Sequence, residues 1–374
     1  MTLEHTIPQF LGGAYAPNKF KSNRVCQRCN SLLGMFVDGS FARTWWVSNW
    51  LRNAARAAYD PVRPIGLPLI CMGPTKLQPP EISADEVCEL WLGPQGEQVY
   101  WIRPHDERLY WYSGGNPRTA KEIDSRAYFY FAQQSNDDQL KTWLSFRDAF
   151  AEERVKKVMC TQVAGANPKD IGFSDPDERD RSRIEYFTQH HIENPCHAIA
   201  LRIEPTYDHR FMAKLGLGLG FSVFGDEYLS TAYAKELQKG TWFRGGAGGE
   251  VPQVRGQTAL SATQPLFHQL TGLPDAVTLT LFPTQDALVL ILDIGRHLSW
   301  KVAACLRDQL PNSPGWAWLD SGQTIVMYKY LQTAVMLSFP EFLAHVNGTH
   351  LHQDLVHLTM RLNLAQRGSG VDPV

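Results

Sequence analysis

Long hydrophobic runs are missing from this sequence. No stretch reaches the roughly 20 apolar residues that a membrane-spanning helix needs, and the longest apolar run, in residues 286–294, suits a buried strand. The first residues also lack the basic and apolar regions of a signal peptide. We therefore expect a soluble, cytoplasmic protein that does not contact a membrane.

The sequence also lacks a large excess of charge of one sign. Its net charge is −2, with 20% charged and 44% hydrophobic residues, as in an ordinary globular protein. A protein that coats nucleic acid would be more basic, although a small active site needs only local positive charge. The seven cysteines are an odd number, and only Cys26 and Cys29 lie close together. This pattern argues against a disulfide framework and favours a reducing compartment with one metal-type pair.

Residues with clear chemical potential are grouped near the N-terminus. They are Glu4-His5-Thr6-Ile7-Pro8, the pair Gly12-Gly13, the element Asn23-Arg24-Val25-Cys26-Gln27-Arg28-Cys29-Asn30, and Gly34. Neighbouring side chains of a strand point to opposite faces, so Glu4 can face a metal ion while His5 is aimed differently. A histidine can activate a water molecule, and a hard cation with oxygen ligands can stabilise a phosphate and its leaving oxygen.

The order and spacing of these elements resembles the HNH endonucleases of the ββα-metal superfamily. The resemblance covers residues 3–38, about a tenth of the chain. It implies that His5 is the general base, that Glu4 and Asn30 ligate Mg²⁺ or Mn²⁺, and that Asn23 braces the loop that orients His5. Asp38 falls where many relatives carry an acid. The implied activity is hydrolysis of DNA phosphodiester bonds to 5′-phosphate and 3′-hydroxyl ends.

One part of the family pattern is missing. Many relatives carry a second Cys-x-x-Cys pair before the acid-His strand, and a tetrahedral zinc site needs four protein ligands. Only three residues precede Glu4 here, so Cys26 and Cys29 form half of a zinc site, and the other cysteines are isolated. Either the given chain begins too late, or the site has decayed, or distant ligands complete it; the first two are favoured. Without zinc, the rest of the chain would have to support the module.

The fold class predicted from the sequence is α+β, with an N-terminal ββα-metal (HNH) module followed by a larger mixed α+β region. Three parts are expected: residues 1–59 as the module with a helical extension, residues 60–165 as an α+β region, and residues 166–374 as a C-terminal α+β region. The prolines between Asp60 and Pro68 mark the first boundary.

Hydrophobic periodicity predicts the individual elements. Strands are expected at 3–8, 87–92, 98–103, 109–112, 126–131, 155–163, 197–203, 277–282, 287–292, 298–303 and 324–330. Helices are expected at 29–37, 41–59, 138–150, 207–224, 227–239, 340–346 and 355–364, with loops at 15–22 and 168–183. Gly216, Gly218 and Gly220 lie inside a helical pattern, which predicts close helix packing rather than a phosphate-binding loop.

Arginines alternate with aromatic residues at 43–56 and 103–112. Such residues suit either phosphate contacts and base stacking or an amphipathic surface with arginine at its rim. Arg43 and Arg52 are the better candidates for DNA binding because they follow the module directly. A histidine-dense segment at 345–357 favours solvated helix-end histidines, because it lacks a regular metal-binding pair with a carboxylate.

The sequence therefore predicts a metal-dependent HNH endonuclease whose C-terminal region selects a target or partner. The alternative is a catalytically inactive nucleic-acid-binding or interaction protein on a degenerate HNH scaffold. The presence of Glu4, His5, Asn23 and Asn30 favours the enzyme. The missing cysteine pair favours the alternative.

Overall fold

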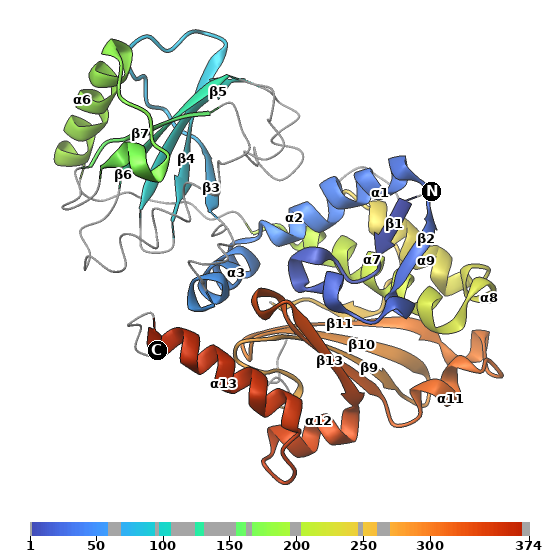
Figure 1. The fold of residues 1–374 in the computed structure, drawn as a ribbon. Coiled ribbons are helices and arrows are strands. Elements are labelled where there is room, and N and C mark those ends of the chain that lie inside the picture. Colours follow the sequence, from blue (N-terminus) through green and yellow to red (C-terminus); the bar gives the residue numbers. More distant parts are fainter. Residues whose placement is uncertain are drawn as a thin grey trace. The chain divides into compact units, whose positions relative to one another are not determined.

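The computed structural model describes residues 2–58, 69–93, 97–105, 124–130, 155–161, 167–194, 203–245, 250–259 and 270–368. Within these ranges the chain is mixed α+β, as predicted (Figure 1). It divides into two compact units: the first joins residues 1–50 to 203–364, and the second joins residues 51–202 to 365–374. The three-part division inferred from the sequence stays a prediction. In the structure, the first fifty residues share a unit with a distant part of the chain.

The N-terminal segment forms two short strands and a series of helices. Strand β1 (Thr2–His5) pairs antiparallel with β2 (Lys21–Val25), and three 3-10 turns lie between them. Helix α1 (Gln27–Leu33) follows and continues through a π-helical turn (Gly34–Asp38) into α2 (Gly39–Ala42). Helix α3 (Trp45–Ala57) comes next.

These boundaries differ from the predicted ones in three places. The predicted strand 3–8 ends at His5, and the predicted helix 41–59 is interrupted before Trp45. Strand β2 was not predicted, because its sequence is polar at four of five positions and none of its residues is buried. Its pairing with β1, rather than its own pattern, determines that it is a strand.

The first unit contains a six-stranded antiparallel sheet in the order β13-β12-β9-β10-β11-β8. The strands are β8 (Gly256–Gln257), β9 (Val277–Pro283), β10 (Ala287–Ile294), β11 (Leu298–Leu306), β12 (Gln323–Tyr328) and β13 (Thr333–Ser338). The four strands predicted here are confirmed. Their apolar runs were recognisable in the sequence because strands such as Ala287–Ile294 are buried at nearly every position. The edge strand β13, mostly half-buried, was not predicted.

Helices precede and follow the strands of this sheet along the chain, and several of them pack on it. They are α7 (Pro205–Phe224), α8 (Asp226–Leu229), α9 (Ala232–Trp242), α11 (Gly315–Leu319), α12 (Phe339–Val346) and α13 (Gln353–Gly368). Helix α7 packs against α9 and β11 (Figure 1). The single helix predicted at 227–239 is two helices, because the Thr231 hydroxyl caps α9 by accepting the Ala234 N–H.

The second unit contains a five-stranded sheet in the order β3-β4-β5-β6-β7, antiparallel except between β6 and β7. Its strands are β3 (Ile70–Pro74), β4 (Glu86–Leu92), β5 (Gln98–Pro104), β6 (Ser125–Tyr130) and β7 (Val155–Met159). Four predicted strands are confirmed, and β3 was not predicted. The predictions at 109–112 and 138–150 lie outside the described residues, as do all residues of the predicted strand 197–203 except Ile203.

The exposed loop predicted at 168–183 is wrong. A 3-10 turn covers Pro168–Ile171, and helix α6 spans Glu178–Glu193. The charged residues form a capping box: the Asp177 carboxylate accepts the Asp180 N–H, and Asp180 accepts the Asp177 N–H. Phe187 of this helix is buried against Tyr100 and other residues of the sheet.

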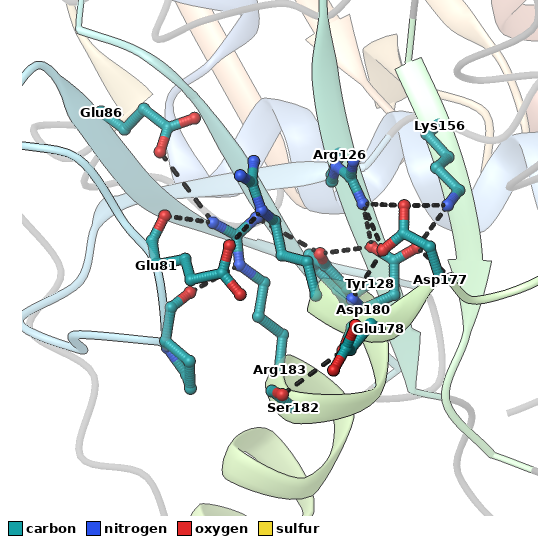
Figure 2. Close-up of polar contacts among 12 residues, drawn as sticks. Glu81, Glu86, Arg126, Tyr128, Lys156, Asp177, Glu178, Asp180, Ser182 and Arg183 are labelled. Carbon is teal, nitrogen blue, oxygen red and sulfur yellow. Dashed lines mark hydrogen bonds and ion pairs between the residues drawn. The ribbon is translucent and has the colours of Figure 1, made fainter.

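Figure 2 shows the ion network that attaches the start of α6 to the sheet. The Asp180 carboxylate is fully buried and accepts the Tyr128 hydroxyl hydrogen at 2.8 Å. It also pairs with Arg126 at 2.6 Å and Lys156 at 2.5 Å, and both cations contact Asp177. Burial acts to raise the pKa of Asp180, but hydrogen bonds from Lys156 and Arg126 outweigh it and lower that pKa. Each charge in this network has a partner, which indicates a structural role.

We predict that Asp180→Ala destabilises the second unit by about 3 kcal/mol at pH 7, because it leaves two cations without their buried partner and breaks the capping box. An unfolded aspartate has a pKa of about 3.9, and the folded pKa is lower. The stabilisation is therefore present above about pH 4 and is lost as the pH falls through the folded pKa. Urea unfolding at pH 7 and pH 3, followed by circular dichroism, measures both effects.

The matched control is Asp175→Ala, which removes an ion pair with Lys169 whose two side chains are 68% and 59% exposed. Exposed pairs contribute about 0–1 kcal/mol, so this variant should unfold close to wild type. Equal losses in the two variants would contradict the structural role of Asp180.

Candidate active site

Strand β1 carries both the predicted general base His5 and the predicted metal ligand Glu4, whereas Asn23, also predicted to be catalytic, lies on β2. Glu4 lies opposite Ser22 and His5 lies opposite Lys21 in the antiparallel register. The Glu4 side chain is buried and His5 is half-buried, as expected for neighbouring residues on opposite faces of a strand. The two functional groups are therefore held by the same backbone but in different surroundings.

The loop after β1 positions His5. The Nδ1 atom of His5 lies 3.4 Å from the carbonyl oxygen of Gly13. A Cβ atom at Gly13 would lie 1.7 Å from the Ile7 carbonyl oxygen, and Gly12 has a φ of +100°, so the loop requires both glycines. When Nδ1 carries the ring proton and donates it to Gly13, Nε2 is left as the nitrogen that can accept a proton.

The Glu4 side chain lies in a buried ion triad. The Lys214 ammonium, from the middle of α7, is 2.9 Å from Glu4 Oε1 and 3.0 Å from Asp38 Oδ2. The lysine side chain is 7% exposed and the two carboxylate side chains are 11% and 17% exposed, so water screens the contacts weakly. The predicted metal ligand Glu4 therefore already has a cationic partner.

Burial and charge act against each other in this triad. Burial raises the pKa of Asp38, and the nearby Lys214 offsets this only in part. Burial acts to lower the pKa of Lys214, but Asp38 and Glu4 outweigh it, so that pKa lies above its usual value. Asp38 Oδ1 is buried and accepts no hydrogen bond from any residue that the structure describes. One ammonium therefore does not satisfy the acceptors of both carboxylates.

The two predicted asparagines differ in their contacts. Asn30 Nδ2 donates to Thr2 Oγ1 at 3.1 Å and to the Leu3 carbonyl at 3.0 Å, which ties the start of α1 to β1. These bonds use the amide hydrogens and leave Oδ1 as the atom available to a cation. Asn23 lies exposed on β2. Its role in bracing the loop stays a prediction from the family resemblance.

Cys26 and Cys29 stand exposed at the start of α1. Cys26 is the N-cap residue, and its Sγ accepts the Cys29 N–H at 3.2 Å. Hydrogen bonding with the Cys29 thiol, together with this backbone hydrogen bond, lowers the pKa of Cys26. In the described ranges no group of three His, Cys, Asp or Glu side chains is arranged to hold a metal ion. The pair thus caps a helix in this structure, and its zinc-binding role stays a prediction.

The oxygen donors of the module fit a hard divalent ion in their chemistry. Mg²⁺ and Mn²⁺ take carboxylate and amide oxygens, as in Glu4 and Asn30. Among the described residues, Asp38 Oδ1 is buried without a hydrogen-bond partner, so this region retains acceptor capacity beyond what Lys214 uses. Lys214 is already in contact with Glu4, and metal binding by Glu4 and Asn30 stays a prediction from the family resemblance.

The two arginines proposed for DNA contact lie in different surroundings. Arg43, at the end of α2, is exposed. Arg52 is buried, and its Nη1 donates to the Gly93 carbonyl oxygen at 3.1 Å within the second unit. The structure thus gives Arg52 a packing contact, and DNA binding by either arginine stays a prediction.

Sequence reasoning missed the part that α7 plays at this site. Lys214, Gly218 and Ser222 are spaced four residues apart and lie on one face of the helix. A Cβ atom at Gly218 would lie 2.8 Å from Thr6 Cγ2, and Ser222 Oγ is 3.4 Å from Thr6 Oγ1. The predicted close packing of the glycines is confirmed. A lysine inside the mostly apolar stretch 211–224 of this helix was the signal that could have pointed to a buried carboxylate.

Comparison with known proteins supports the assignment of the N-terminal segment. The family model described as HNH endonuclease matches residues 1–46, so this segment carries an HNH module. No curated protein and no solved structure gives a significant match to the chain.

We predict that Gly218→Ala destabilises the first unit by about 1–3 kcal/mol, because the added methyl group overlaps Thr6 at a packed contact. Gly34→Ala is the matched control: Gly34 is helical, and an added Cβ meets no atom within 4 Å. Alanine there should stabilise by up to about 1 kcal/mol through helix propensity. Thermal unfolding separates the two, and a Gly218→Ala protein as stable as Gly34→Ala would refute the close packing of α7 on Thr6.

Proposed function

We propose that the HNH module makes this protein a metal-dependent endonuclease that hydrolyses DNA phosphodiester bonds. The observation that carries the proposal is the placement of His5, which lies beside the acid Glu4 on β1 with its Nδ1 facing the Gly13 carbonyl oxygen. The family match over residues 1–46 supports the same activity.

The proposed chemistry assigns one role to each side chain. His5 Nε2 accepts a proton from the attacking water, whose oxygen bonds to phosphorus as the bond to the 3′-oxygen breaks. The contact of Nδ1 with Gly13 orients the ring for this transfer. A Mg²⁺ or Mn²⁺ ion held by Glu4 and Asn30 would stabilise charge on the phosphate and on the leaving oxygen. Asn30 is fixed for this role by its bonds to β1.

We further propose that the region after the module selects the DNA target or a partner. The module occupies a small part of the chain, and two sheets with their helices make up much of the remainder. The net charge of −2 gives the chain no overall basic excess, so DNA binding would use local positive groups such as the exposed Arg43. Among the described helices, none has the length and apolar character required to cross a bilayer.

A second candidate function is non-catalytic nucleic-acid binding on a degenerate HNH scaffold. Two observations favour it. Glu4 is paired with Lys214 rather than open to solvent, and Cys26 serves as a helix cap in the described structure. Both candidates predict DNA binding, but only the enzyme cuts.

We predict that the purified protein nicks supercoiled plasmid in the presence of Mg²⁺ or Mn²⁺, and that His5→Ala lowers the nicking rate by about 100-fold or more, because the general base is lost. The matched control is His297→Ala, which removes an exposed histidine on a turn of the same unit and should cut at the wild-type rate. Circular dichroism shows whether each variant keeps its fold.

The outcomes separate the two candidates. The enzyme is supported if wild-type protein nicks the plasmid and a folded His5→Ala protein binds DNA without nicking it. Wild-type protein that binds DNA but leaves plasmid intact with Mg²⁺, Mn²⁺, Co²⁺ and Ni²⁺ supports the non-catalytic candidate. An equal loss of nicking rate in His5→Ala and His297→Ala would contradict the assignment of His5 as the general base.

A further inference from the structure

Lys214 is a buried cation in the middle of α7. Its neighbours Ala213 and Leu215 are fully buried, and the helix surface around them packs on α9 and β11. An ammonium is costly to bury unless it is paired, and this one is paired only through the carboxylates of the HNH module among the contacts described. Lys214 thus brings a positive charge from α7 to the acidic residues of the module.

The charges at this point do not balance. Glu4 and Asp38 contribute two carboxylates and Lys214 contributes one ammonium, which leaves an excess of one negative charge when all are ionised. Within the described ranges, Asp38 Oδ1 is a buried acceptor without a hydrogen-bond partner. A site with surplus negative charge and a surplus acceptor oxygen favours a cation of higher charge than an ammonium.

We propose that Lys214 is a built-in competitor for the divalent ion: its ammonium occupies Glu4, and the ion must displace it from this carboxylate in order to bind. The proposal rests on the proposed function, because it takes Glu4 as the metal ligand of the module. It goes further by making a residue of α7, far from the module in sequence, set the affinity of the module for metal.

Geometry explains why the two cations exclude each other at Glu4. Lys214 Nζ lies 2.9 Å from Glu4 Oε1, at full hydrogen-bond contact. A divalent ion binds carboxylate oxygen at about 2.1 Å, so both cations on this carboxylate would lie within a few ångströms of each other. Their repulsion is strong in a site that water screens poorly. Binding of the ion therefore requires the ammonium to move.

The position of Lys214 links this competition to the rest of the first unit. Helix α7 is anchored to β1 through Gly218 and Ser222, and it packs on the large sheet through Gly216. A ligand that shifts α7 relative to β1 would withdraw the ammonium and raise the metal affinity of the module. By linkage, metal binding would favour the same shift.

The test measures binding of Mn²⁺ alone to the full-length protein, with the free ion followed by electron paramagnetic resonance. We predict that Lys214→Met binds Mn²⁺ about tenfold more tightly than wild type or better, because one unit charge is removed at contact distance from the ligand oxygen. The matched control is Lys156→Met, which removes a lysine that also bridges two carboxylates, in the second unit. Its Mn²⁺ affinity should equal that of wild type.

Thermal melting and two double variants show whether a folding defect contributes to the result. Lys214→Met leaves two buried carboxylates unpaired, so the apo protein should melt at a lower temperature and recover more than wild type when Mn²⁺ is added. Combining Lys214→Met with Asp38→Asn relieves this repulsion and keeps Glu4, so tight Mn²⁺ binding should remain. Combining Lys214→Met with Glu4→Gln should abolish the gain.

An unchanged or weaker Mn²⁺ affinity in Lys214→Met, in protein shown to be folded, would overturn the proposal. Tightening that persists after Glu4→Gln would overturn it as well, because the ion would then bind elsewhere. The nicking assay distinguishes failure of the enzyme proposal from failure of the proposed competition between Lys214 and the metal ion. If wild type never cuts DNA while the Lys214 variants bind Mn²⁺ as predicted, the enzyme proposal fails and the competition stands.

Discussion

The contact on which the first unit depends is the pairing of one buried ammonium with two carboxylates of the HNH module. Lys214 projects from α7 to Glu4 on β1 and to Asp38 in the π-helical turn. An unpaired charge at any of these positions would be strongly destabilising, so each residue constrains the other two. The triad therefore fixes the strand that carries His5 against a helix from a distant part of the chain.

Packing around α7 shows how the module is supported. Phe211 stacks on Phe41 with ring centroids 3.9 Å apart, and Gly218 allows Thr6 to approach the helix backbone. Related modules can use a tetrahedral zinc site as a structural staple. Here the described structure gives Cys26 a capping role and supplies apolar and ionic contacts from residues 203–364. These contacts attach the module to the rest of the first unit.

Local sequence patterns predicted the elements that local forces determine. The apolar runs of β9, β10 and β11 and the long helix α7 were found because their burial repeats along the chain. The polar strand β2 and the charged start of α6 were missed, because pairing with β1 and the buried Asp180 network decide them. His5 and Glu4 were identified by their motif, whereas the partner Lys214 lies about 200 residues away and no local pattern connects them.

A double-mutant cycle between Glu4→Gln and Lys214→Met tests the central pairing most directly. Urea unfolding of wild type, both single variants and the double variant gives the coupling free energy between the two side chains. If the buried triad holds the module on α7, the coupling is about 2 kcal/mol or more, and the double variant is more stable than the sum of the single losses predicts. A coupling below about 0.5 kcal/mol, as for independent sites, would contradict the pairing.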